Sequence, residues 1–293
     1  KAALNANTYL QQASQTEFGK TKAKQLKENA EYTIYAKSHP VSFNPKNLGA
    51  NINSAYDDYF PVETPDGSQL FFTRRLGNNE DLFQSKMNAG SRTIAQPLDL
   101  NINTPEFNEG SPSISANANL LFFTTCNRPN VFGSCDIFYT YFDGKKWTPA
   151  SGINKPVNTP YWDAQPSFSA HGRAMYFSSD RPGGKGGRDI WVSYLNDQLQ
   201  WSDPQNLGPT INTPSDEQTP FIHPDGVSLY FASNGHVGMG MNDLFLSKKN
   251  GNTWTIPVNL GYPINTEKDE MGLFVTTDGK KAYYASSRDG GSG

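Results

Sequence analysis

Charged residues and long apolar runs are scarce in this 293-residue sequence. Asp, Glu, Lys and Arg make up only 18% of it, and the formal net charge is −3. A weakly acidic chain lacks the excess of cations that binding to a phosphate backbone requires, so we expect no nucleic-acid partner. Apolar runs such as Leu120 to Phe123 are far shorter than the roughly 20 residues that cross a bilayer as a helix. We therefore expect no direct membrane span.

The usual signatures of enzymes and metal sites are also missing. The sequence contains no G-x-S-x-G nucleophile motif, and its four histidines are scattered among expected turns without metal-ligand spacing. The glycine-rich stretch 183–187 is similar to a phosphate loop, but it joins two expected strands and opens no helix. We therefore interpret the chain as non-enzymatic, and we expect no catalytic residue, metal or cofactor.

Cysteine is present only at Cys126 and Cys135, nine residues apart in one expected loop between strands. The two thiols are close enough in the sequence to form a disulfide in an oxidising environment, and the alternative is a pair of free thiols. The sequence begins at Lys1 without an initiator Met or an apolar leader. We therefore expect that any signal peptide or lipid anchor has been removed, so that a disulfide would be the main sign of export.

Aromatic residues, glycine and proline are abundant, and one short phrase recurs along the chain. The phrase is Ile or Val followed by Asn, and its asparagines are Asn53, Asn103, Asn158, Asn212 and Asn265. The intervals between them are 50, 55, 54 and 53 residues. A period near 50 with strand-forming composition is typical of β-propeller blades and not of helical repeats.

Each repeat predicts four strands. An acidic residue follows the phrase and, in four of the repeats, lies three residues before a proline; these acids are Asp58, Glu109, Asp163, Glu217 and Glu270. A turn and an apolar run then predict a hairpin, an Asp opens a third strand, and a fourth strand begins near a Trp in three of the repeats. The sequence predicts a mainly β fold, a five-bladed propeller of four-stranded antiparallel blades over residues 41–293.

The two ends of the expected propeller are incomplete in different ways. The fifth repeat stops near Gly291, before any third strand, so the last blade is expected to be truncated. Residues 43–49 match the end of a fourth strand, and we expect them to complete the last blade and close the ring. Residues 1–40 have helical spacing instead, with one helix expected near 2–13, a break near Phe18-Gly19 and a second helix after it.

The propeller resembles the PD40 (WD40-like) repeat of TolB-type propellers over residues 43–293. The resemblance is carried by stretches such as Pro166-Ser167-Phe168-Ser169, Tyr176 to Arg181 and Asp189-Ile190-Trp191. Residues 156–159, 179–184, 235–240 and 259–266 are more narrowly similar to the propeller of multidomain OmpA-family proteins of Bacteroidetes, some of which belong to the type IX secretion system. This resemblance implies that residues 1–40 end a tetratricopeptide-like array, and that peptidoglycan binding belongs to domains absent from this sequence.

Two sets of residues are candidates for a site. The five repeated acids could ring the mouth of the channel and bind a cation or a basic peptide, or each could accept backbone N–H bonds at a turn. Residues that differ between repeats are candidates for binding a partner through loops, because aromatic and Arg side chains are favoured at binding hot spots. These are Arg74, Arg75, Arg128, Trp162, Arg181, Arg188 and His236.

These observations favour a periplasmic scaffold that binds other envelope proteins, which could include subunits of the secretion machinery. In the full-length protein it could be anchored to the outer membrane. The alternative is a propeller that binds or cleaves glycans. A glycosidase would require a convergent pair of carboxyl groups in the channel, whereas a scaffold would not.

Overall fold

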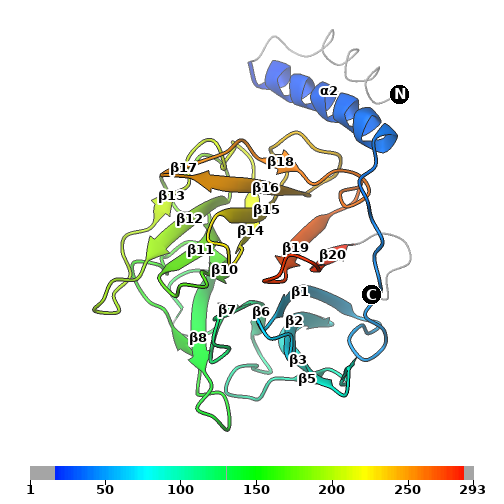
Figure 1. Ribbon diagram of the computed structural model, residues 1–293. Coiled ribbons are helices and arrows are strands. Elements are labelled where there is room, and N and C mark those ends of the chain that lie inside the picture. The colour runs from blue at the N-terminus through cyan, green and yellow to red at the C-terminus, as the bar shows by residue number, and fades with distance from the viewer. Residues whose placement is uncertain (1–16, 130, 287–293) are drawn as a thin grey trace.

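The protein is mainly β with one helix, as seen in a computed structural model that describes residues 17–129 and 131–286 (Figure 1). The helix is α2 (Glu17–Ser38). Antiparallel sheets follow in chain order. The first sheet contains β1 (Asp57–Glu63), β2 (Gln69–Leu76), β3 (Asn79–Asn88), β4 (Ser91–Arg92) and β5 (Gln96–Pro97). The second contains β6 (Asn108–Ile114), β7 (Leu120–Cys126), β8 (Cys135–Tyr141) and β9 (Ser151–Gly152).

The remaining sheets repeat this order. The third contains β10 (Asp163–Phe168), β11 (Ala174–Ser179), β12 (Asp189–Tyr194) and β13 (Gln205–Asn206). The fourth contains β14 (Glu217–Ile222), β15 (Ser228–Ser233), β16 (Asp243–Asn250), β17 (Thr253–Trp254) and β18 (Val258–Asn259). The fifth contains β19 (Glu270–Val275) and β20 (Ala282–Ser286). In the first and fourth sheets two short strands pair with the third strand, so the outer strand is divided into two pieces.

The sheets surround a centre, as expected for a propeller. Their first strands, β1, β6, β10, β14 and β19, contact one another in that order, and β19 returns to contact β1 (Figure 1). Apolar side chains fill the space between sheets, with Phe71, Phe123, Phe177 and Phe231 fully buried. The propeller prediction is therefore confirmed at the level of the fold.

Five complete blades are not confirmed. The described part of the fifth sheet has two strands, and no strand is assigned to residues 43–49. The Phe43 ring does lie 6.5 Å from Tyr284 of β20, and the Val41 N–H donates to the Tyr262 carbonyl at 2.7 Å. Residues 41–43 thus run beside the fourth and fifth repeats, but the outer strand expected over 43–49 is absent from the structure.

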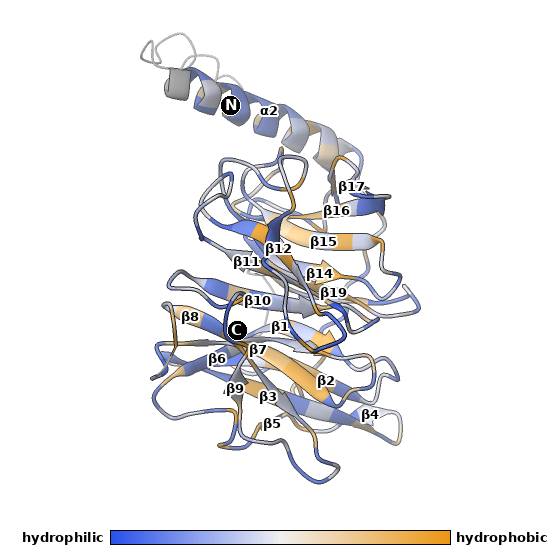
Figure 2. Ribbon diagram, turned by 90° about the vertical axis from the view of Figure 1, so that its left-hand side faces the viewer, coloured by the Kyte–Doolittle hydropathy of each residue, from blue (hydrophilic) through white to orange (hydrophobic). Residues whose placement is uncertain are grey.

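The N-terminal helix differs from its prediction in one respect. We expected a break near Phe18-Gly19, but α2 begins at Glu17 and continues through both residues. The helix expected near 2–13 lies outside the described residues, and a tetratricopeptide-like array is not confirmed. The side chain of Gln25 donates to the Gly235 carbonyl at 3.1 Å, and Lys37 forms an ion pair with Glu267 at 3.4 Å. The helix therefore lies against loops of the fourth and fifth repeats (Figure 2).

Every first strand contains the same backbone irregularity. Its pairing with the second strand shifts at a residue in the left-handed region, which precedes a Pro in four sheets and Leu273 in the fifth. These residues are Phe60 (φ 52°), Ser111 (51°), Gln165 (56°), Thr219 (48°) and Gly272 (67°). A side chain in this region costs of order 1–3 kcal/mol, so the surrounding fold must hold the bulge in place.

The repeated Ile/Val-Asn phrase joins successive sheets. Ile102, Val157 and Ile211 are fully buried. Asn212 accepts the Ile190 N–H at 2.8 Å and donates to the Ile190 carbonyl at 3.0 Å, so its amide binds the third strand of the preceding sheet. Asn158 makes the same two bonds to Ile137, and Asn265 makes them to Leu244. The phrase recurs because each linker between sheets must bind backbone groups that face it.

The asparagines of the phrase provide a direct test. Asn212→Ala should lower the free energy of unfolding by about 2–4 kcal/mol, because it leaves two buried backbone groups of Ile190 without partners. Asn53→Ala should lower the free energy of unfolding by less than about 1 kcal/mol, since Asn53 is half-buried and its side-chain amide donates to the exposed Asn47 side chain. Urea denaturation of both variants measures the difference. Equal costs would contradict the role assigned to the phrase.

Candidate functional site

The five repeated acids lie at the beginnings of the inner strands, where four are buried and Asp58 is half-buried. Glu109, Asp163, Glu217 and Glu270 have no solvent exposure. The Asp163 carboxylate accepts the Thr159 N–H at 2.7 Å and the Thr159 hydroxyl at 2.6 Å, and it also accepts the Ser179 hydroxyl at 2.6 Å. Equivalent bonds join Asp58 to Ser54, Glu109 to Thr104, Glu217 to Thr213 and Glu270 to Thr266. The acids therefore fix each linker to its strand and do not form an open ring at the channel mouth.

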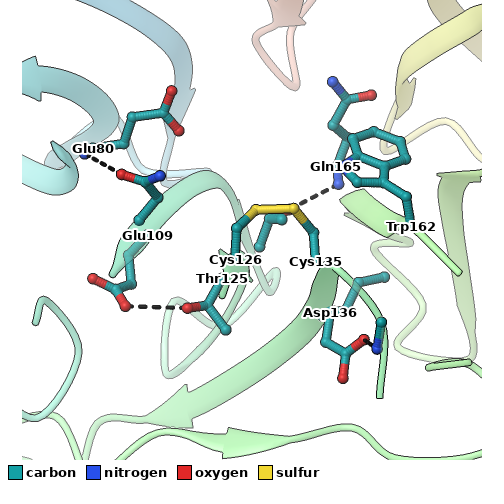
Figure 3. The surroundings of a disulfide bond; sticks show 12 residues. Glu80, Glu109, Thr125, Cys126, Cys135, Asp136, Trp162 and Gln165 are labelled. Carbon is teal, nitrogen blue, oxygen red and sulfur yellow. Dashed lines mark hydrogen bonds between the residues drawn. A yellow bond between two sulfur atoms is a disulfide. The ribbon is translucent and has the colours of Figure 1, made fainter. Parts of the chain in front are cut away.

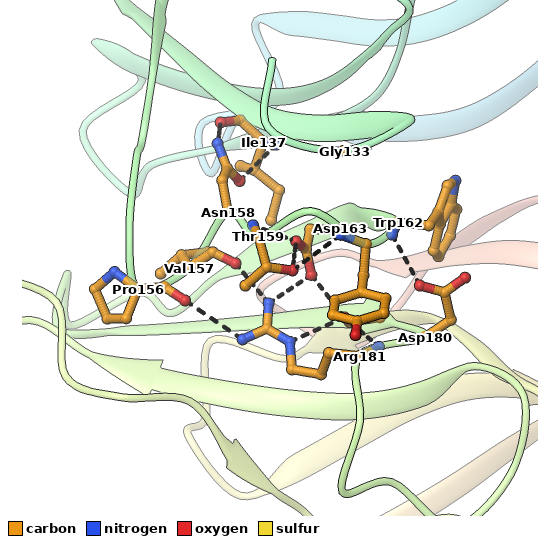
Figure 4. A network of polar contacts seen from close by, with 12 residues as sticks. Gly133, Ile137, Pro156, Val157, Asn158, Thr159, Trp162, Asp163, Asp180 and Arg181 are labelled. Atoms are coloured by element: carbon orange, nitrogen blue, oxygen red, sulfur yellow. Dashed lines mark hydrogen bonds and ion pairs between the residues drawn. The ribbon is translucent and has the colours of Figure 1, made fainter.

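Three of the arginines expected in variable loops lie inside this network. Arg181 is 8% exposed, and its guanidinium bonds to the Asp163 carboxylate and to the Val157 carbonyl (Figure 4). It also lies 4.8 Å from the centre of the Phe177 ring. Arg74 makes the same contacts with Asp58 and Ile52, and Arg128 makes them with Glu109 and Ile102.

The sequence interpretation takes Arg74, Arg128 and Arg181 as loop candidates for binding a partner, whereas in the structure their guanidinium groups are largely enclosed by contacts within the fold. Arg74 lies within β2, whereas Arg128 and Arg181 each follow their second strand by two residues, so the three arginines do not occupy matching places in the sequence. In the fourth sheet His236 occupies the equivalent place: its ring contacts the Ile211 carbonyl at 2.8 Å and lies 5.8 Å from the Phe231 ring. Burial lowers the pKa of His236, so this position lacks the fixed charge of the arginines.

The other loop candidates are partly open. Arg188 lies 4.2 Å from the centre of the Trp162 ring, and its guanidinium donates to the Gln218 side chain at 2.7 Å. Arg75 is exposed and donates to the Gly77 carbonyl at 3.3 Å. Trp162 and Arg188 are therefore brought together, whereas Arg75 lies apart from them in the first repeat.

Cys126 and Cys135 form a disulfide at the end of the β7–β8 hairpin (Figure 3). The two residues face each other across the pair of strands, and Cys135 also forms an isolated bridge with Trp162. The Phe132 and Gly133 N–H groups donate to Asp136 at 2.7 and 3.3 Å. The disulfide therefore fastens the loop that lies beside Trp162.

The glycine-rich stretch 183–187 binds its own aspartate. The N–H groups of Lys185 and Gly186 both donate to Asp189, so they are occupied and cannot cradle a phosphate. A Cβ on Gly186 would lie 2.0 Å from the Ser215 carbonyl oxygen of the next linker. Gly133 and Gly240 approach the following linkers in the same way. These glycines are required because two backbones pass within contact distance.

Two buried carboxyl groups have strongly shifted pKa values. Burial raises the pKa of Glu217 to about 6 against opposing hydrogen bonds from Thr213 and Ser233. Burial also raises the pKa of Asp243 to about 6, although its carboxyl accepts bonds from Met239 and Gly240. Both groups belong to the fourth sheet. Among the described residues no group of three or more His, Cys, Asp or Glu side chains is placed to hold a metal ion.

An open pocket lies in the channel, at the opposite end of the inner strands from the acids. Its volume is about 360 Å³. The prolines after the bulges, Pro61, Pro112, Pro166 and Pro220, line it together with Phe60, Phe168, Phe221 and Phe274. Glu63 is the one charged residue among the described residues of its wall. The Glu63 carboxyl forms an ion pair with Arg92 and accepts the Tyr283 hydroxyl at 3.0 Å.

Sequence reasoning missed this pocket although its signal was present. The spacing between acid and proline was used to align the repeats, but only the acid was considered as a site. A proline marks the place where each of four strands bulges into the channel, and the fold alone brings those places together.

These features define a β-propeller with a pocket in its central channel. Solved structures with a similar fold include TolB from Acinetobacter baumannii (14% identity, TM-score 0.49) and a TolB from Agrobacterium tumefaciens (13%, 0.51). An α-L-arabinofuranosidase from Lactobacillus brevis is also similar (12%, 0.53). The matches cover 80%, 81% and 82% of this chain, and 55%, 78% and 87% of those chains, respectively.

At these identities the likeness shows the fold alone, and that fold is shared by TolB proteins and glycoside hydrolases. No family model and no curated protein sequence matches the chain. In the described residues no helix combines the length and the apolar character that crossing a membrane requires. Function must therefore be inferred from the site.

The arginines allow a test that separates structural residues from loop residues. Arg181→Ala should lower the free energy of unfolding by about 3–5 kcal/mol, because Asp163 would be left as an uncompensated buried charge. Arg188→Ala should cost no more than about 1 kcal/mol, since it removes a partly exposed contact with Trp162. Thermal and urea denaturation of the two variants measure these changes in stability. A stable Arg181→Ala protein would contradict the proposed network.

The raised pKa of Glu217 predicts a pH dependence. An acid whose pKa is higher in the folded than in the unfolded protein stabilises the fold at pH values below its unfolded-state pKa. This contribution to stability is lost as the pH rises through its folded-state pKa. Over the shift from 4.5 to about 6 this amounts to about 2 kcal/mol. Glu217→Gln should therefore be more destabilising at pH 4 than at pH 8 by about that amount, measured by urea denaturation at each pH. A pH-independent difference would exclude this effect.

Proposed function

We propose that this chain is a non-enzymatic, protein-binding propeller and that a segment of its partner enters the channel pocket. The observation that supports this most is the composition of the pocket wall: prolines and phenyl rings from all the sheets surround about 360 Å³, with few polar groups. Pockets of this size and apolar character are typical binding sites, and aromatic walls provide large contact areas.

The alternative of a glycan-cleaving propeller has less support from the pocket. A retaining or inverting glycosidase uses two carboxyl groups about 5–9.5 Å apart on either side of the scissile bond. The described wall of the pocket contributes the Glu63 carboxyl alone, and that group is already bonded to Arg92. The buried acids such as Asp163 and Glu217 are enclosed by their own linkers. Glycan binding without cleavage stays as the second candidate, to be tested directly.

We further propose that the protein works in the periplasm and that its partners are other cell-envelope proteins. The disulfide between Cys126 and Cys135 supports an oxidising compartment, because such bonds are rare where thiols are kept reduced. The resemblance noted in the sequence makes secretion-machinery subunits one class of candidate partner. Any link to peptidoglycan would require domains that this sequence does not include.

Site-specific photocrosslinking tests this proposal and identifies the face that binds. A photoreactive phenylalanine replaces Ala170 at the pocket rim, Tyr161 beside Trp162, or Ile256, which is 82% exposed in the loop between β17 and β18. We expect the probe at position 170 to crosslink the protein to one discrete envelope protein, and the probe at position 256 to give no crosslinked product. A product from 161 alone would assign binding to the loop face. Absence of protein products together with binding on a glycan array would favour the second candidate.

A further inference from the structure

The pocket wall breaks the repeat at one point. Glu63 stands at the third position after its bulge, where the other inner strands place the apolar residues Ile114, Phe168, Ile222 and Val275. Its partner Arg92 stands where three other repeats place Trp147, Trp201 and Trp254. The first repeat thus replaces an apolar residue and a Trp together, with an acid and a base.

The replacement falls at the junction of the first and fifth sheets. At other junctions the Trp packs against an aromatic residue of the preceding sheet, with Trp147 6.1 Å from Phe71 and Trp254 6.2 Å from Tyr176. The aromatic residue at this junction is Tyr283, whose hydroxyl bonds to Glu63. Burial and the nearby Glu63 carboxylate raise the pKa of Tyr283, so that its hydroxyl stays a donor.

The two oxygens of the Glu63 carboxyl differ in their surroundings. Arg92 and Tyr283 both bond to Oε1. Within the described residues Oε2 accepts no hydrogen bond, although Glu63 is only 8% exposed and is part of the pocket wall. Arg92 is not part of that wall, so its guanidinium lies behind the carboxyl group. The pocket therefore has one available carboxylate oxygen in a largely apolar enclosure.

Packing alone does not explain this arrangement. A buried ion pair is often no more stabilising than apolar side chains of similar volume, and the second, third and fourth sheets fill the same place without charge. The Phe rings of the wall add a second preference, because the face of an aromatic ring attracts a cation. Both features point to a positively charged group on an apolar stem.

We propose that the pocket takes the side chain of a lysine from the partner, with its ammonium group on Glu63 Oε2 and its methylenes against the prolines and phenyl rings. This inference rests on the proposed function and names the chemistry of the segment that enters. A single available oxygen suits the compact ammonium group better than the planar guanidinium of arginine, which pairs best with both oxygens of a carboxylate. Glu63 is then the residue that determines specificity.

Capped single amino acids provide the probes. Nα-acetyl-lysine N-methylamide, its norleucine counterpart and its arginine counterpart are titrated separately, and binding is followed by NMR through the methyl signals of Ile114 and Ile222 in the pocket. Norleucine has the stem without the charge. We expect lysine to bind about tenfold more tightly than norleucine, with arginine between them, since a hydrogen bond to a charged group contributes that much or more.

Substitution of Glu63 tests the assigned contact. In Glu63→Gln lysine should lose about tenfold in affinity and fall to the level of norleucine, whose affinity should not change. Glu106→Gln, the same change at an exposed glutamate of the linker before β6, should leave every affinity as in the unmodified protein. A lysine preference that survives in Glu63→Gln would overturn the inference.

A double variant separates binding from a purely structural role at the junction. Glu63→Ile with Arg92→Trp restores the residue types of the other repeats, so it should fold even if Glu63→Gln does not. We expect it to bind norleucine and lysine equally. If the unmodified protein shows no preference for lysine, or binds none of the probes, the inference is wrong. The crosslinking at position 170 would still decide the proposed function independently.

Discussion

The linker between successive sheets is the constraint on which the rest of the structure depends. A propeller has no continuous hydrogen bonding from one sheet to the next, so each linker must satisfy its backbone groups and hold two sheets at a fixed angle. The chain does this with two side chains per linker. An asparagine amide such as that of Asn212 binds the third strand of the preceding sheet, and a buried acid such as Glu217 binds the linker to the next strand. Both groups are fully enclosed, where an unmade bond costs most.

This constraint explains why the most repeated residues are not the site. A carboxylate that accepts N–H and hydroxyl bonds from its own linker is occupied, and Arg74, Arg128 and Arg181 complete the same unit by bonding to the acid and to the carbonyl of the Ile or Val. The fourth repeat uses His236 for the carbonyl bond, and burial raises the pKa of its acid, Glu217. Polar groups of this kind stabilise the scaffold, and the chemistry available to a ligand lies elsewhere.

The pocket is a product of the same architecture. Each inner strand bulges at a left-handed residue, which precedes a proline in four of the five, and the bulges meet at the centre because the strands contact one another in a circle. Identical repeats would give a neutral pocket with fivefold symmetry. The first repeat interrupts that symmetry with Glu63, Arg92 and a bond to Tyr283, at the junction where the first and last sheets meet. The chemistry of the pocket therefore depends on one departure from the repeat, which lies where the ring closes.

By itself the sequence determined the repeat, the strand order within each unit and the propeller class, because these depend on a local pattern of residues that recurs five times along the chain. The pairing of the two cysteines also followed from their places in one hairpin. Tertiary structure decided the rest. The sequence assigns Arg128 and Arg181 to loops, and only the fold places them beside buried acids that lie 18 or 19 residues earlier in the chain. The four prolines after the bulges form one site only because the fold brings their strands together, and Glu63 can be seen as exceptional only when its neighbours across the channel are known. A site assembled from residues 50 apart depends on closure of the ring, which local sequence does not contain.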